Sequence, residues 1–131
     1  MAETPYRLLQ ANAEGDVLVL TITEAQVEGD TIAQTLHQEL LAARQTEDAR
    51  KVVVDFQNVI YISSVAFGPL LHLRRTLQGV NGRLIVCGLN KMVGDIFYTT
   101  RMVSPTGEFS APFELKPDVP SAIAALTTGA Q

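Results

Sequence analysis

The chain has 131 residues, 47% of them hydrophobic and 18% charged, which predicts one globular domain over residues 1–131 with a single core. A net charge of −4 and scattered basic residues argue against nucleic-acid binding, which needs a basic patch or stripe. One cysteine, Cys87, excludes an internal disulfide and favours a cytoplasmic location, and because no apolar run approaches the ~20 residues that span a bilayer, we expect no membrane insertion.

The first third of the chain predicts a hairpin and a helix. Residues 16–23 are rich in β-branched side chains and predict a strand. Residues 6–11 precede it across a glycine turn, so the two segments predict an antiparallel hairpin. Residues 32–44 carry leucines at helical spacing and predict a helix, with Asp30 or Thr31 as the source of the N-cap oxygen.

Strands and helices alternate in the middle of the chain. Residues 51–56 are a short continuous apolar run, which is typical of a strand buried on both faces. Residues 65–78 predict a helix, residues 83–88 a second buried strand, and residues 89–101 a shorter helix. Three apolar side chains define the predicted buried face of that shorter helix: Met92, Ile96 and Phe97.

The last segments complete an α/β pattern. Residues 103–112 contain turn-forming pairs and predict a loop, residues 113–115 a short strand, and residues 119–126 a closing helix. The predicted order is β-β-α-β-α-β-α-β-α. Because strands alternate with helices after an opening hairpin, we expect a mixed β-sheet with helices packed on it.

A pair of serines stands where an extended segment meets a helix. Residues 59–62 lead into Ser63 and Ser64, and the helix follows directly. Free backbone N–H groups and the helix dipole favour an anion at such a place. A phosphate there adds about −1.5 to −2 charges at pH 7, which would repel a partner packed on the same surface while leaving the domain folded. The simpler interpretation is an N-cap serine that adds about 1 kcal/mol of stability and has no signalling role.

Pro69 complicates this helix start. It lacks the N–H that the fifth residue of a helix should donate, and proline is well tolerated only in the first turn. The helix therefore either begins nearer Gly68 or has a kinked start.

The segment around the serines resembles the signature of the anti-sigma factor antagonists of the STAS family, in which an acidic strand end and an asparagine precede Tyr-Ile-Asp-Ser-Ser-Gly-Leu-Gly. Six positions match this pattern without gaps: Asp55, Asn58, Tyr61, Ile62, Ser64 and Gly68. Residues 79–102 and 117–126 are similar to the family's later segments, so the resemblance covers most of residues 16–126. The chain departs from the pattern with Ser63 in place of the aspartate, Val65 in place of a serine or threonine, and Ala66 in place of a glycine, which makes it a Ser-Ser variant of the motif.

The resemblance implies a STAS-like fold and a phospho-switchable binding module. In the family, the unphosphorylated antagonist binds an anti-sigma factor/serine kinase of the histidine-kinase-like ATPase type and thereby releases the sigma factor to regulate transcription. Ser64 occupies the place of the phosphorylated serine, with Ser63 as the rival acceptor. A phosphatase and a second copy of the chain are further candidate partners. The expected partner-binding residues are Asp30, Thr31, Asp55, Asn58, Ser63, Ser64, Val65 and Phe67.

Two of these expectations have a structural alternative. Asp55 ends a predicted strand, so it is either part of the switch surface or a carboxylate that stabilises the following turn. The whole domain is either a switch or a constitutive scaffold subunit of a signalling or transport complex without phosphorylation. The missing aspartate at Ser63 and the position of Pro69 favour the scaffold.

No enzyme or cofactor is predicted. His37 and His72 are the two histidines, and each is expected on a helix surface or flank. With one cysteine and two histidines, a zinc site is not expected. His72 lies two turns beyond Ser64 on the same predicted helix, and no partner acid is identifiable, so the two do not predict a catalytic pair.

Overall fold

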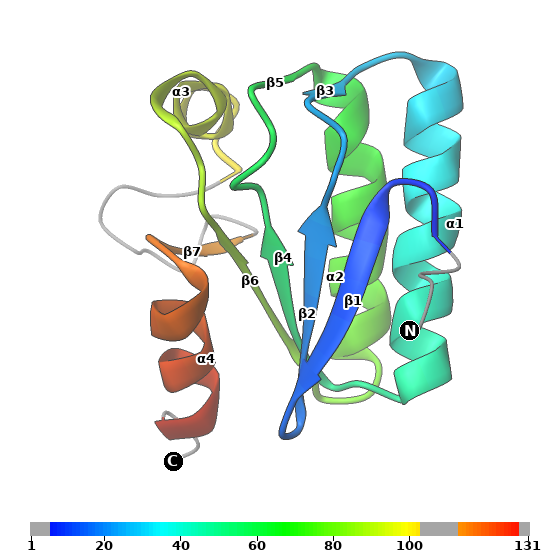
Figure 1. Cartoon of the computed structure of the whole chain (residues 1–131), viewed down its shortest axis with the longest axis vertical. Helices are drawn as coiled ribbons and strands as arrows, with labels where there is room; N and C mark the ends of the chain where they lie inside the picture. Colours follow the sequence, from blue (N-terminus) through cyan, green and yellow to red (C-terminus); the bar gives the residue numbers. More distant parts are fainter. Residues whose placement is uncertain (1–5, 103–112, 129–131) are drawn as a thin grey trace.

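A mixed β-sheet organises the part of the chain that this computed structural model describes, residues 6–102 and 113–128 (Figure 1). β1 (Leu9–Glu14) and β2 (Val17–Ile22) pair antiparallel, and every other neighbouring pair in this sheet is parallel. The mixed α/β sheet predicted from the order of elements is therefore confirmed. In spatial order the strands are β1 (Leu9–Glu14), β2 (Val17–Ile22), β4 (Lys51–Asp55), β6 (Arg83–Cys87) and β7 (Glu114–Lys116).

The opening hairpin forms as predicted, but its first strand lies further along the chain. Glu14 pairs with Val17, so Gly15 and Asp16 make a two-residue loop. Gly15 has a φ of 64°, a left-handed value that glycine adopts without strain. This tight turn sets the register, and it places the first strand at Leu9–Glu14 instead of residues 6–11.

Helices cover both faces of the sheet (Figure 1). α1 (Asp30–Glu47) and α2 (Phe67–Gln78) pack on one face, and α4 (Val119–Thr128) packs on the other. Alternate residues of the central strand point to opposite sides, so Val52 and Val54 join the larger core under α1 and α2 while Val53 joins the smaller core under α4. Because both faces of β4 are buried, its middle residues form a continuous apolar run.

The start of α1 differs from the sequence prediction. The helix begins at Asp30, and Gly29 occupies the N-cap position with a φ of 88°. The carbonyl of Gly29 accepts the N–H of Ala33 at 3.0 Å, and no side chain among the described residues caps the helix. The prediction that Asp30 or Thr31 supplies the N-cap oxygen is therefore wrong, because both residues already lie inside the first turn.

α3 (Lys91–Thr99) also has a different buried face from the predicted one. Asn90 caps the helix, and its Oδ1 accepts the N–H of Val93 at 2.8 Å. Val93 and Phe97, four residues apart, point into the core. Met92 is 56% exposed, so its assignment to the buried face is wrong. The helix begins two residues later than predicted, at Lys91.

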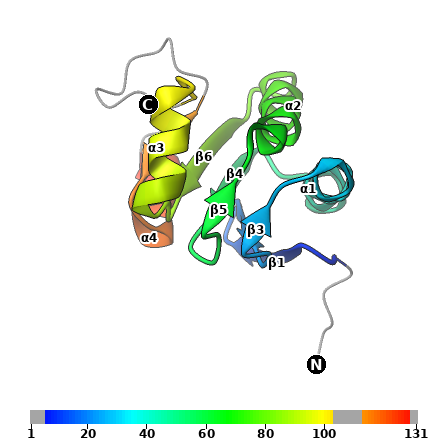
Figure 2. The ribbon, with the colours of Figure 1, turned by 90° about the horizontal axis from the view of Figure 1, so that it is seen from above.

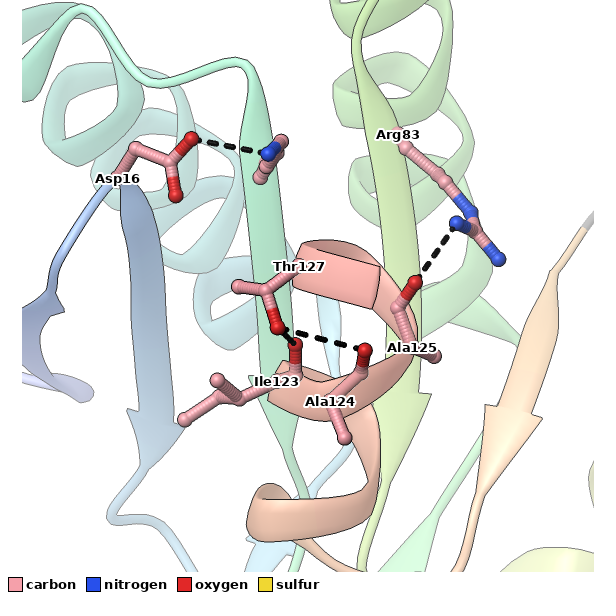
Figure 3. A network of polar contacts seen from close by, with 7 residues as sticks. Asp16, Arg83, Ile123, Ala124, Ala125 and Thr127 are labelled. Atoms are coloured by element: carbon pink, nitrogen blue, oxygen red, sulfur yellow. Dashed lines mark hydrogen bonds and ion pairs between the residues drawn. The ribbon is translucent and has the colours of Figure 1, made fainter. Parts of the chain in front are cut away.

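Arg83 ties the far end of the sheet to α4 (Figure 3). Its Nη1 donates to the carbonyl of Ala125 at 3.1 Å, near the end of α4, where a cation is favourable. Its Nε and Nη2 each donate to the Glu114 carboxylate at 2.6 Å. Nearby, the Lys51 ammonium hydrogen-bonds Asp16 and lowers the pKa of that carboxyl. These contacts lie at the amino ends of the parallel strands.

The end of the chain follows the predicted pattern within the described residues. β7 spans Glu114–Lys116 and α4 spans Val119–Thr128. The loop predicted at residues 103–112 lies outside the described part of the chain. Among the helices that the structure describes, none combines the length and the hydropathy that a membrane crossing requires.

Candidate functional site

A short parallel ladder of two strands, β3 (Gln26–Val27) and β5 (Tyr61–Ile62) in Figure 2, precedes the serine pair. Directly after β5, the N–H of Ser63 donates to the carbonyl of Val27 at 3.0 Å. The backbone that leads into the serines is therefore held by hydrogen bonds on a segment far away in sequence.

The helix start has two parts, a short 3₁₀ turn, η1 (Ser64–Ala66), and then α2. Pro69 is the third residue of α2 and lies in its first turn, where a missing N–H costs little. Of the two alternatives for Pro69, the later start of the α-helix is confirmed. The proline explains why Ser64 stands in a 3₁₀ turn and not in the α-helix itself.

The two serines have opposite environments. Ser64 is exposed, and its hydroxyl makes no hydrogen bond within the described residues. The Oγ of Ser63 is buried and has no hydrogen-bond partner among those residues. Ser63 occupies the N-cap position of η1, but its side chain accepts no N–H, and neither serine caps α2. The interpretation of the pair as simple capping serines is therefore not supported.

Three other predicted partner-binding residues are exposed: Asp30, Thr31 and Asn58. Asp30 and Thr31 are exposed at the start of α1, which packs against η1. Val65, next to Ser64, is half-buried. Asn58 is exposed but has a structural contact, because its Nδ2 donates to the carbonyl of Ile22 at 3.5 Å.

Asp55 and Phe67 do not belong to this surface. Asp55 is 1% exposed, and its carboxylate accepts the backbone N–H of Gln57 at 3.0 Å and the side-chain amide of Gln57 at 2.7 Å. It therefore stabilises the turn after β4, the second of its two predicted roles. Phe67 is 5% exposed and packs edge-on against Phe97, so it belongs to the core. Sequence reasoning placed both on the surface because it could not show which way each side chain points.

Cys87 is a buried neighbour of Asp55. Its side chain is fully buried, and its Sγ lies 3.8 Å from Asp55 Oδ1. Burial and then the Asp55 charge raise the pKa of the thiol to about 12. The thiol is therefore protonated at neutral pH and unsuited to nucleophilic chemistry.

The raised pKa of the Cys87 thiol predicts that the folded chain loses stability at alkaline pH. The unfolded thiol ionises near its ordinary pKa of about 8.5, whereas the folded thiol keeps its proton up to about pH 12. Above the unfolded pKa the folded state binds the extra proton, so the free energy of unfolding falls as pH rises, by at most about 1.4 kcal/mol per unit. Urea unfolding of wild type and Cys87→Ala between pH 8 and 10.5 measures this. If the free energy of unfolding falls with pH at the same slope in both proteins, the buried neutral thiol is contradicted.

The two histidines meet between α1 and α2. His37 Nε2 and His72 Nδ1 share a hydrogen bond, and their ring centroids are 4.6 Å apart. The sequence predicted separate helix-flank positions, because 35 residues separate them and no local pattern reports the contact. His72 is therefore engaged with His37. Within the described ranges, no group of three His, Cys, Asp or Glu side chains could hold a metal ion.

The fold and the family model agree. Residues 9–111 match the model of the STAS domain, and the chain therefore belongs to the STAS domain family. This match includes the ladder, the serine pair, α2 and α3.

Solved structures of similar shape include anti-sigma factor antagonists. A putative anti-sigma factor antagonist from Thermotoga maritima is similar with a TM-score of 0.75 and 12% identity, over 90% of this chain and 93% of that one. An anti-sigma factor antagonist from Mycobacterium paratuberculosis has a TM-score of 0.71 and 19% identity, over 90% and 92%. The Bacillus cell fate determinant SpoIIAA in its phosphorylated form has a TM-score of 0.55 and 15% identity, over 70% and 82%. At these identities the likeness shows a shared fold.

Proposed function

We propose that this chain is an anti-sigma factor antagonist whose binding is controlled by phosphorylation of Ser64. The unphosphorylated chain binds an anti-sigma factor/serine kinase of the histidine-kinase-like ATPase type in the cytoplasm, and the sigma factor is released to start transcription. The chain itself acts as a binding module without catalysis. Membership of the STAS family and the named functions of two proteins of similar fold support this proposal.

The contrast between the two serines carries the proposal. A kinase must reach the hydroxyl that it phosphorylates, and Ser64 is exposed, with a hydroxyl that has no hydrogen-bond partner among the residues that the structure describes. The Oγ of Ser63 is buried, so it is the poorer acceptor. A protein of similar fold has been solved in a phosphorylated form, which supports a fold able to carry the modification.

A phosphate on Ser64 changes the surface without disturbing the core. The residue stands in η1, and within the described part of the chain its side chain makes no hydrogen bond that the modification would break. A doubly charged group placed against a docked protein costs several kcal/mol unless it is paired. The partner surface that we propose consists of Asp30, Thr31, Asn58, Ser64 and Val65.

Ser64→Glu is expected to weaken binding of the partner kinase at least ~100-fold while leaving the fold intact. Ser64→Ala is expected to bind as wild type does and to resist phosphorylation. Calorimetric titration of each variant with the purified kinase, and mass spectrometry after incubation with ATP, provide the two measurements. Ser63→Ala is the matched control. The Ser63 hydroxyl is buried and should accept no phosphate, so this variant should be phosphorylated as wild type is. Tight binding by Ser64→Glu would refute the switch.

The scaffold remains the second candidate because Ser63 replaces the aspartate of the family signature. A scaffold subunit would form a stoichiometric complex whatever the state of Ser64. Mass spectrometry of the chain purified from its native cells separates the two functions. A stable complex with no phosphoserine under any growth condition would support the scaffold.

A further inference from the structure

Two large apolar side chains are exposed in segments that Asn90 connects, at the end of the molecule that carries Ser64. Ile60 is 55% exposed and Met92 is 56% exposed, the highest values among the large hydrophobic residues that the structure describes. Ile60 lies just before β5, and Met92 is the second residue of α3. We call these two side chains the Ile60–Met92 patch.

Asn90 joins the two parts of the patch. Its Nδ2 donates to the carbonyl of Val59 at 3.2 Å and lies 3.5 Å from that of Ile60. Its Oδ1 caps α3 two residues before Met92. One side chain therefore holds the Ile60 loop against the first turn of α3, so the patch is already formed in the isolated chain.

The patch has a fixed position relative to Ser64. Ile60 and Tyr61 both donate their N–H groups to the carbonyl of Ala25, at 2.8 and 3.2 Å, which pins the segment that runs on to Ser64. α3 is held to the start of α2 by Phe67 and Phe97, whose rings pack edge-on with centroids 5.1 Å apart. Figure 2 looks onto this end and shows α3, β5 and the start of α2 together.

The segments that lead into the patch and the serine pair carry acidic side chains. Residues 23–29, 56–66 and 88–90, which include β3 and β5 and lead into α1, α2 and α3, contain Glu24 and Glu28 but no lysine or arginine. Asp30 follows directly and is exposed. Lys91, the first residue of α3, forms an ion pair with Asp95 at 3.1 Å. A protein that covers this end therefore gains from basic side chains around an apolar contact.

We infer that the Ile60–Met92 patch is the apolar anchor of the interface with the partner of the Ser64 switch, received by an apolar pocket on the partner that is edged with lysine or arginine. This inference rests on the proposed function and extends its surface from α1 and η1 to α3. The two parts act differently. The patch supplies affinity by burying apolar area, and Ser64 decides whether the surfaces can close.

The test measures binding of the full chain to each purified histidine-kinase-like anti-sigma factor of the same genome by biolayer interferometry. The double variant Ile60→Ser with Met92→Ser is expected to bind ~100-fold more weakly, mainly through faster dissociation. Tyr98→Ser is the matched control: Tyr98 is 39% exposed on the same helix but lies on another face, and its loss should leave the affinity unchanged. Circular dichroism and urea unfolding check that each variant is folded.

A second pair of substitutions tests the acidic surroundings. Glu24→Gln with Glu28→Gln is expected to slow association about tenfold at low salt and to reduce its dependence on ionic strength, with little change in dissociation. Faster association of this variant would contradict a basic partner surface.

The outcomes separate the anchor from the switch. If the Ile60–Met92 double variant dissociates as slowly as wild type while Ser64→Glu fails to bind, the anchor is refuted and the switch stands. If the double variant binds weakly while Ser64→Glu binds as wild type does, the anchor stands and the switch is refuted. If no such kinase binds the wild-type chain, both are refuted.

Discussion

Replacing Phe97 with alanine is expected to lower the free energy of unfolding by about 3–5 kcal/mol. Phe97 is fully buried and packs edge-on against three other rings. The ring centroids lie 5.5, 5.1 and 6.2 Å away, on Phe56, Phe67 and Phe113. Removing the central ring leaves a cavity where α3, the start of α2 and the end of β4 meet. The three surrounding aromatic side chains cannot move far enough to fill this cavity.

Urea unfolding monitored by circular dichroism measures this loss, and Met92→Ala provides the control. Met92 lies on the same helix but is 56% exposed, so its truncation should change stability by no more than about 0.5 kcal/mol. Equal losses for the two variants would show that α3 buries a different face. Because Phe97 contacts Phe67 beside η1, Phe97→Ala should also loosen the helix start that carries Ser64.

Gly88→Ala is expected to cost about 3 kcal/mol, from two causes that act together. Gly88 has a φ of 74°, which is unfavourable for any residue with a Cβ. A Cβ there would also lie 2.6 Å from Asp55 Oδ1 and 3.0 Å from the backbone nitrogen of Gln57. The added Cβ would therefore push the buried carboxylate away from the N–H groups whose hydrogen bonds it accepts.

Two other glycines separate these causes. Gly15 has a similar φ of 64° with no atom within 4 Å of the added Cβ, so Gly15→Ala should show the backbone cost alone, about 1 kcal/mol. Gly68 lies in α2 with open space and an ordinary φ, so Gly68→Ala should be neutral or slightly stabilising. If Gly88→Ala costs no more than Gly15→Ala, the contact with Asp55 does not constrain this turn. Denaturant unfolding of the three variants gives the comparison.

Much of the fold could be predicted because its signals are local. The apolar run at β4, the leucine spacing of α1 and the glycine turn of the hairpin each act within a few residues. Predicted boundaries were less accurate, because caps and registers depend on contacts with other segments. The start of α1 at Asp30 depends on the backbone of Gly29, and the position of β1 depends on its pairing with β2.

The candidate site was predicted in outline and not in detail. The sequence alone singled out Ser63 and Ser64 at a helix start, and Pro69 indicated either a later start of the α-helix or a kinked one. It could not determine that Ser64 is exposed while the Oγ of Ser63 is buried. Neighbouring residues at a 3₁₀ turn point in different directions, and which of them faces water depends on how segments distant in sequence pack around the turn.

The amino-acid sequence by itself determined the order of strands and helices and the position of the serine pair, because hydrophobic spacing and turn residues act along the chain. The tertiary structure decided which side chains form the surface. It buried Asp55 and Phe67, left Met92 and Ile60 exposed, and brought His37 into contact with His72. The reason is physical: burial depends on contacts between segments distant in sequence, which no local pattern records.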